Sequence, residues 1–203
     1  MKILIACEYS GRVRDAFLKL GHDAMSCDLL PTDVPGPHYQ GDVFDILDQG
    51  WDLMIAHPPC TYLCNSGVRW LYEKPGRWEQ MTDGAKFFKN LLFADIPKIA
   101  VENPVMHGHA RELIGGYKAS QTIQPWEFGH TENKRTGLWL RGLPYLKPTH
   151  DMRPEMEGMT YAEKNKIHYA SPGVDRWKLR SMTYQGIADA MAQQWGGTLD
   201  VIA

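Results

Sequence analysis

A cysteine in a proline-braced turn is the residue of this chain best placed to do chemistry. The turn His57-Pro58-Pro59-Cys60 directly follows an apolar run, Leu53-Met54-Ile55-Ala56, that is typical of a buried strand. Proline fixes the backbone of the turn, and open α/β sheets bind ligands at the carboxyl ends of their strands. This placement favours the Cys60 thiol as a nucleophile, although a small, inert cysteine in a turn fits these residues equally well.

Acidic and glycine residues follow two other predicted strands at positions that suit a nucleotide. Residues 2–6 lead into Cys7-Glu8-Tyr9-Ser10-Gly11 ahead of a helix, and residues 23–27 end at Asp28. A helix N-terminus can accept a polar group, and an acid at the second strand tip can bind ribose hydroxyls. Each signal is weak alone, because a single glycine is less than a full fingerprint and Asp28 also fits as a loop cap.

A second candidate acid, Glu102, ends the strand predicted at residues 98–102. The proline of Glu102-Asn103-Pro104 stiffens the backbone that follows this strand. By itself, Glu102 is better explained as a solvated turn residue than as a catalytic group.

The elements that must position these residues alternate along the chain between strand and helix. This alternation predicts an α/β fold with a mostly parallel sheet and helices on both faces. Apolar spacing and turn residues predict the following elements. We expect strands at residues 2–6, 23–27, 52–56, 98–102, 122–125 and 137–140, a strand end at 41–43, and helices at 13–20, 81–93 and 183–194.

Composition indicates one ordinary globular domain covering residues 1–203, with 43% hydrophobic and 23% charged residues. The sequence has no basic and apolar leader and no run of about 18 apolar residues, so we expect a cytoplasmic protein with reduced cysteines. A net charge of −2 gives no general attraction to nucleic acid. Any such partner must therefore be held by a local patch.

Together, these motifs resemble those of the DNA (cytosine-5) methyltransferases and occur in that family's order along most of the chain. The nucleophile motif is matched by Pro58-Pro59-Cys60, continued to Gly67 and Arg69, and the Glu-Asn-Val motif by Glu102-Asn103-Pro104. Further matches are the helix after Asp83-Gly84, the basic segment Asn133-Lys134-Arg135 before a strand, and Gly186-Ile187-Ala188 in the last helix. The resemblance implies a Rossmann-like, S-adenosylmethionine-dependent methyltransferase fold.

The resemblance also implies a mechanism and a cofactor. The Cys60 thiolate would add to carbon 6 of cytosine, which makes carbon 5 able to accept a methyl group from S-adenosylmethionine. Glu102, with a pKa raised by burial, would hydrogen-bond or protonate ring nitrogen 3. Arg135 or Lys134 would support the ring carbonyl or a phosphate. The implied cofactor-binding residues are Glu8, Tyr9, Gly11, Asp28, Asp42 and Pro58, and the implied substrate-binding residues are Asn103, Arg69 and Lys134.

The sequence departs from the family at several positions. Only one glycine of the first motif is kept, Pro104 replaces a valine, and His57 replaces a small residue. Residues 141–180 stand where a target-recognition domain is expected, and their eight basic against five acidic side chains give a formal charge of +3. With the aromatic residues Tyr145, Tyr161, Tyr169 and Trp177, this short insert suits nucleic acid, but an ordinary solvated loop is nearly as good an interpretation.

Three other functions remain open. The chain could alkylate carbon 5 of a free cytosine nucleotide or of RNA, which the missing recognition domain favours and the basic insert opposes. It could also be a non-catalytic relative that binds DNA or the cofactor, as the altered first motif suggests. A zinc deaminase is disfavoured, because Pro59-Cys60 and Cys64 are one residue too far apart and no His-x-Glu precedes them. We expect no metal site, and an oligomer is possible.

Overall fold

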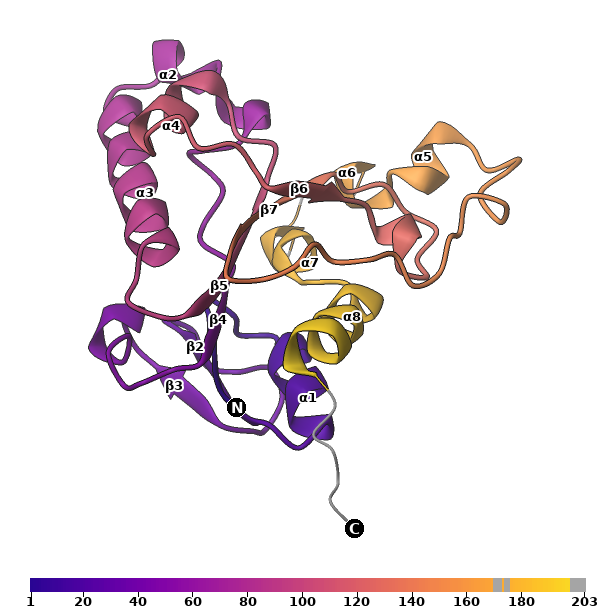
Figure 1. The fold of residues 1–203 in the computed structure, drawn as a ribbon. Helices are drawn as coiled ribbons and strands as arrows, with labels where there is room; N and C mark the ends of the chain where they lie inside the picture. Colours follow the sequence, from indigo (N-terminus) through magenta and orange to yellow (C-terminus); the bar gives the residue numbers. More distant parts are fainter. Residues whose placement is uncertain (170–172, 174–175, 198–203) are drawn as a thin grey trace.

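The computed structural model describes residues 1–169, 173 and 176–197 (Figure 1). Within these residues the strands form one sheet in the order β3-β2-β1-β4-β5-β7-β6. Strands β1 to β5 run parallel to one another, whereas β7 runs antiparallel to both β5 and β6. The strands are β1 (Lys2–Ala6), β2 (Asp23–Asp28), β3 (His38–Gln40), β4 (Leu53–Ala56), β5 (Lys98–Pro104), β6 (Gln121–Ile123) and β7 (Thr136–Arg141).

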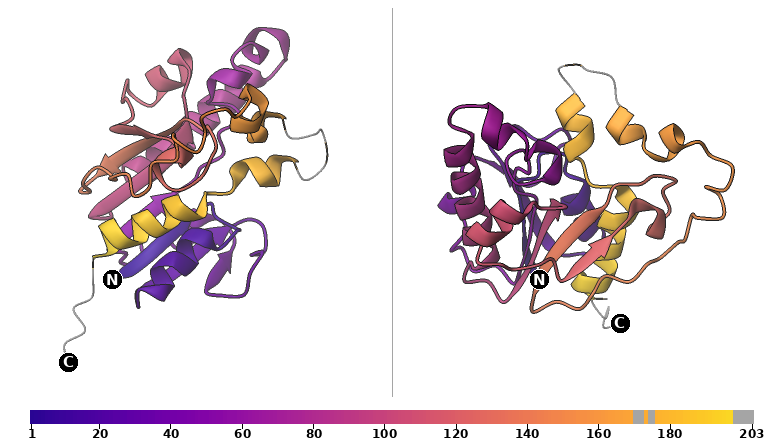
Figure 2. Two further views of the ribbon diagram at one scale, coloured as in Figure 1. Left: turned by 90° about the vertical axis from the view of Figure 1, so that its right-hand side faces the viewer. Right: turned by 90° about the horizontal axis from the view of Figure 1, so that it is seen from above.

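Helices cover both faces of the sheet (Figures 1 and 2). The α-helices are α1 (Arg12–Lys19), α2 (Trp70–Glu73), α3 (Arg77–Leu92), α4 (Gly108–Leu113), α5 (Tyr161–Lys164), α6 (Lys166–Tyr169), α7 (Arg176–Ser181) and α8 (Gln185–Gly196). Short 3₁₀ helices lie at η1 (Val43–Asp45), η2 (Asn65–Gly67) and η3 (Pro125–Glu127). The predicted Rossmann-like α/β architecture is confirmed.

The central strands β1, β4 and β5 each contain a continuous apolar run because both of their faces are buried there. Successive side chains point to opposite faces, so Leu4 and Met54 pack toward α3 while Ile3 and Leu53 pack toward α1 and α8. The core is therefore divided by the sheet into two apolar layers. This arrangement leaves the carboxyl edge of the parallel strands as the place where polar side chains can gather.

Two predicted elements differ from the structure by three residues or more. Residues 41–43 were expected to end a strand, but the strand lies earlier, at β3, and the Asp42 side chain instead accepts a hydrogen bond from Phe44 N at 3.0 Å and caps η1. The helix expected from residue 81 begins at Arg77, directly after Gly76 in a left-handed conformation with φ 72°. Local capping, which apolar spacing does not reveal, sets both boundaries.

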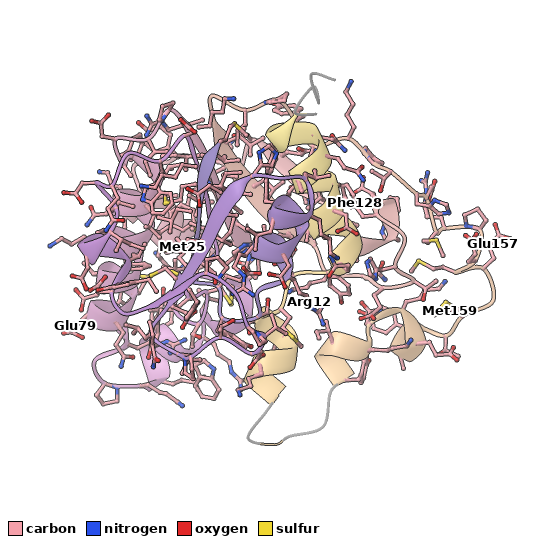
Figure 3. The ribbon with its side chains drawn as sticks, turned by 90° about the horizontal axis from the view of Figure 1, so that it is seen from below. Arg12, Met25, Glu79, Phe128, Glu157 and Met159 are labelled. Atoms are coloured by element: carbon pink, nitrogen blue, oxygen red, sulfur yellow. The ribbon has the colours of Figure 1, made fainter. Side chains whose placement is uncertain are left out.

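The insert projects from the body of the molecule. Figure 3 shows Glu157 and Met159 at its outer end, on the opposite side of the molecule from Glu79 in α3. Its first part is tied to the body through Phe128 and His150, and the C-terminal helix α8 packs back onto α1. No helix in the described ranges is long and apolar enough to cross a membrane.

A buried arginine holds the loop between β2 and β3 against α1. The Arg14 side chain is fully buried and pairs with Asp15 at 2.8 Å, and its guanidinium donates to Ser26, Thr32 and the Val34 carbonyl at 3.2 Å each. A Cβ atom at Gly36 would meet this guanidinium at 2.6 Å, so a larger residue there would have to displace the Arg14 side chain. The arginine thus fixes the path of the chain around the first strand ends.

We expect Arg14→Met to lower the free energy of unfolding by about 3 kcal/mol, because it leaves several buried acceptors without a donor. Asp15→Asn is the matched control. The Asp15 side chain is 38% exposed, so this change should cost less than about 1 kcal/mol. Urea unfolding followed by circular dichroism measures both. Equal effects of the two substitutions would show that the buried hydrogen bonds of Arg14 do not stabilise the loop.

Candidate active site

Adjacent parallel strands bring His57 and Glu102 together. Ala56, the last residue of β4, pairs with Val101 in β5, so His57 and the next β5 residue, Glu102, are neighbours near the carboxyl edge. His57 Nδ1 lies 2.9 Å from Glu102 Oε2, and the two side chains are only 7% and 13% exposed. The His57 backbone is fixed by a hydrogen bond from its N–H to the Ala6 carbonyl. The two side chains form a buried, hydrogen-bonded pair.

The turn after β4 places Cys60 close to this pair. The Cys60 carbonyl accepts hydrogen bonds from the N–H groups of Leu63 and Cys64 at 3.0 and 3.1 Å, which wind the chain into a compact turn. Cys64 then pairs with Met106 in an isolated bridge, so the turn is tied to the segment that follows β5. The charge of Glu102 is close enough to affect the pKa of the Cys60 thiol. Sequence motifs separated by some forty residues thus meet at one edge of the sheet.

Cys60 and Cys64 form a coupled pair of thiols. Their mutual hydrogen bond, together with burial, raises the pKa of Cys60, and the same bond lowers the pKa of Cys64 to about 5. Ser66 Oγ lies 3.1 Å from the Cys64 sulfur and further stabilises its thiolate. The pair therefore loses its first proton more readily than an isolated thiol does, and the two sulfurs share the proton that remains.

This coupling predicts how the thiols react with iodoacetamide. Because one thiolate is already present, alkylation should change less than about twofold between about pH 6 and pH 8, whereas an isolated thiol gains about tenfold per pH unit. Stopped samples analysed by peptide mass spectrometry give the rate at each cysteine. Cys64→Ser leaves Cys60 without its partner and should restore the steep dependence. A steep dependence in the unaltered protein would contradict the coupling.

The pKa of Glu102 differs from the expectation. Burial, the strongest influence, raises it, but the hydrogen bond from His57 and the positive charge of Lys134 together outweigh burial. The pKa of Glu102 therefore lies below its usual value, and the expectation of a raised pKa was wrong for this state of the protein. The carboxyl group is ionised at neutral pH because the protein supplies a donor and a cation beside it.

A narrow pocket opens beside Glu102 under the start of α8. Lys134 reaches this pocket from the segment before β7, and its Nζ donates to the Met182 carbonyl at 3.4 Å. Arg135, the neighbouring basic residue, is exposed. The structure thus brings Lys134 to the candidate acid and does not bring Arg135 there. The pocket is lined by Glu102, Ile123, Lys134, Thr136, Thr183, Tyr184, Ile187 and Met191.

The remaining residues expected to bind substrate lie in different surroundings. Asn103 is buried, and its Nδ2 donates to the carbonyl of Pro58 at 3.4 Å, so it holds the nucleophile turn against β5. Asn103 Oδ1 is buried without a hydrogen-bond partner in the described residues. Arg69 is exposed, and its guanidinium stacks on the ring of Trp70 at 4.2 Å. Arg69 therefore lies outside the cluster around Glu102.

Most side chains of the turn after β1 make contacts within the protein and are not free to bind a cofactor. Glu8 is buried, and its carboxylate accepts from the N–H groups of Val13 and Arg14 at 2.8 and 3.3 Å, which caps α1. Tyr9 is buried with its hydroxyl 2.8 Å from Ser181 Oγ. Gly11 has φ 74° and packs against Arg14. The N-terminal amides of α1 are thus already satisfied, and an anionic cofactor group would need other donors.

The acids at the neighbouring strand ends fit the nucleoside part of S-adenosylmethionine better. Asp28 ends β2, and Asp42 is exposed after β3; both lie near enough to Cys7 for their charges to raise its pKa, after the larger effect of burial. Burial also raises the pKa of Asp28. Carboxylates at such strand ends accept hydrogen bonds from ribose hydroxyls. No group of three or more possible metal ligands is found among the described residues.

Three residues of this cluster were not assigned a role from the sequence. His57 was noted only as a departure, Cys64 only for its spacing from Cys60, and Tyr184 not at all. The pairing of β4 with β5 was the signal that could have placed His57 beside Glu102. Ala56 and Val101 are paired, so the residues that follow them are neighbours. Tyr184 reaches the cluster by tertiary packing alone, and its hydroxyl donates to Glu132 at 2.8 Å.

No family model matches this sequence, and the comparison with curated proteins gives no match. Among solved structures, a protein described as a DNA modification methyltransferase encoded within a prophage (E. coli) is 14% identical, with a TM-score of 0.46. The match covers 73% of this chain and 51% of that one. A methyltransferase of Entamoeba histolytica is 13% identical, with a TM-score of 0.48, over 73% of this chain and 57% of that one. The chain thus spans a little over half the length of these structures.

Proposed function

We propose that this chain is an S-adenosylmethionine-dependent methyltransferase that modifies carbon 5 of cytosine in DNA through a covalent Cys60 adduct. The observation that supports this most is the meeting of Cys60, Glu102 and Lys134 at the carboxyl edge of the sheet, from three separate segments. A nucleophile, an acid and a cation close enough for their charges to interact suit addition to a heterocyclic ring. The single domain and the cytoplasmic location inferred from the sequence belong to the same proposal.

Each residue has a chemical role in this proposal. Cys60 gives its proton to the Cys64 thiolate and its sulfur forms a bond to carbon 6, while the electron pair of the ring double bond moves toward nitrogen 3. Only the protonated fraction of Glu102, which takes its proton from solvent, can supply the proton that nitrogen 3 takes up, and Lys134 stabilises negative charge on the ring carbonyl. Bound S-adenosylmethionine would supply the electrophilic methyl group to carbon 5, and loss of the carbon 5 hydrogen to solvent would then break the bond to Cys60 and restore the ring double bond. Asp28 and Asp42 would hold its nucleoside part.

Exposed aromatic residues in the insert support nucleic acid as the substrate. Tyr145, Tyr161 and Tyr169 are 63%, 72% and 61% exposed, and bases stack on such rings in single-stranded complexes. Arg153 is already engaged, because it pairs with Asp151 at 2.6 Å and lies over the ring of Trp126. The side chain of Trp177 lies outside the described residues.

A free cytosine nucleotide or RNA is the second candidate substrate. The observation that favours it is the short insert, which leaves little surface to read a DNA sequence. Labelled S-adenosylmethionine is offered with duplex DNA, single-stranded DNA, RNA or dCMP, and 5-methylcytosine is measured after digestion. Product in DNA supports the proposal, and product in dCMP or RNA alone supports the second candidate. Absence of product from all four would contradict both.

A further inference from the structure

The most unusual feature of the cluster is His57, which forms a hydrogen bond with one carboxylate oxygen of the candidate acid, Glu102. His57 stands where the resembled family has a small residue, and its Nδ1 lies 2.9 Å from Glu102 Oε2. No hydrogen bond to Glu102 Oε1 is found among the described residues. One carboxylate oxygen thus accepts a hydrogen bond from His57, and Glu102 also lines the pocket that Lys134 reaches.

The surroundings of the second ring nitrogen of His57 indicate which of the two nitrogens carries the proton. His57 Nε2 is buried and has no hydrogen-bond partner in the described part of the chain. A proton on this nitrogen would be a buried donor without an acceptor, which is more costly than a lone pair there. We therefore place the proton on Nδ1, so that His57 donates to Glu102.

We propose, on the basis of the proposed function, that His57 is a positioning residue that holds Glu102 by Oε2, directs Oε1 to the pyrimidine ring and sets the pH range of proton donation. When nitrogen 3 takes the proton from Oε1, the new carboxylate is stabilised by the hydrogen bond from Nδ1 to Oε2. His57 loses no proton in this step. Its hydrogen bond is stronger to the product carboxylate than to the acid, so it favours proton transfer.

The charged and titratable groups around Glu102 come from several elements. Lys134 before β7 lowers the pKa of Glu102, and Cys60 follows β4. Tyr184, at the start of α8, lines the same pocket, and burial raises its pKa, so it stays neutral. Without the hydrogen bond from His57, only Lys134 opposes the effect of burial on the pKa of Glu102. The pKa of Glu102 then rises, and the acid form persists to higher pH.

The test compares His57→Leu, which removes the donor, with His57→Asn, whose amide can place an N–H near the position of Nδ1. In single-turnover methyl transfer to cytosine DNA, the pH above which the rate falls should move up by about one unit or more in His57→Leu. It should stay close to that of the unaltered protein in His57→Asn. If His57→Leu does not fold, His57→Ala with and without added imidazole replaces it, and imidazole should reverse the shift.

A second measurement separates this proposal from the proposed function. Glutamate labelled with ¹³C at the carboxyl group gives a titration of Glu102 by NMR, with the signal identified by its loss in Glu102→Gln. The titration should shift upward in His57→Leu whether or not methyl transfer occurs. Identical titrations in His57→Leu, His57→Asn and the unaltered protein would overturn the role of His57. A shifted titration without methyl transfer to any substrate would contradict the proposed function alone.

Discussion

Replacing Cys60 with serine is expected to lower the rate of methyl transfer by at least about 10³-fold, or about 4 kcal/mol of activation free energy. A hydroxyl group is far less acidic than a thiol and forms almost no anion at neutral pH, so addition to carbon 6 is lost. The side chain is nearly the same size, so the turn that the Cys60 carbonyl organises should remain. Single-turnover transfer of a labelled methyl group to the accepted substrate measures the change.

Cys27→Ser is the matched control for this substitution. Cys27 lies in the core in β2 and has no part in the proposed chemistry. Circular dichroism establishes that both variants fold. If Cys60→Ser loses no more activity than Cys27→Ser, Cys60 is not the nucleophile.

Replacing Glu102 with glutamine is expected to lower the same rate by about 10²-fold to 10⁴-fold, the usual contribution of a positioned acid. The amide oxygen can still accept the hydrogen bond of His57 Nδ1, so the contact at the end of β5 is kept. The amide cannot give up a proton when charge develops at ring nitrogen 3. The loss should therefore lie in the rate of the chemical step, with substrate affinity changed much less.

Glu112→Gln makes the same change on an exposed residue of α4 and should leave the rate unchanged. Fluorescence anisotropy with a labelled oligonucleotide gives the affinity, and single-turnover kinetics give the rate. A variant with normal rate and weakened binding would assign Glu102 to substrate binding instead of proton transfer.

The sequence predicts the fold well because both faces of the sheet must be apolar. Continuous apolar runs such as Leu53–Ala56 locate the central strands, and helical spacing locates α1, α3 and α8 within a few residues. Their ends are less predictable, since Gly76 and Asp42 act through local backbone geometry and capping. The short helices of the insert have little apolar periodicity, and the sequence analysis did not predict them.

The candidate site is predictable where strand order alone brings residues together. Cys60 follows β4, and Glu102 lies near the carboxyl end of the neighbouring parallel strand β5, so their proximity follows from the α/β topology. Lys134 and Arg135 are adjacent, so their side chains point in opposite directions. The sequence does not show which of the two points toward Glu102. Glu8 caps α1 through contacts of the folded backbone, so its residue type alone did not distinguish a cofactor ligand from a helix cap.

Trapping of the covalent adduct tests the central claim most directly. The protein is incubated with S-adenosylmethionine and single-stranded or duplex oligonucleotides that carry 5-fluorocytosine, where carbon 5 has no hydrogen to lose after methyl transfer. Intact mass spectrometry and peptide mapping then examine the product. We predict a stable complex with the methylated oligonucleotide bonded to Cys60, absent in Cys60→Ser. Methyl transfer to unmodified cytosine without any trapped complex, or a complex that persists in Cys60→Ser, would contradict the proposed mechanism.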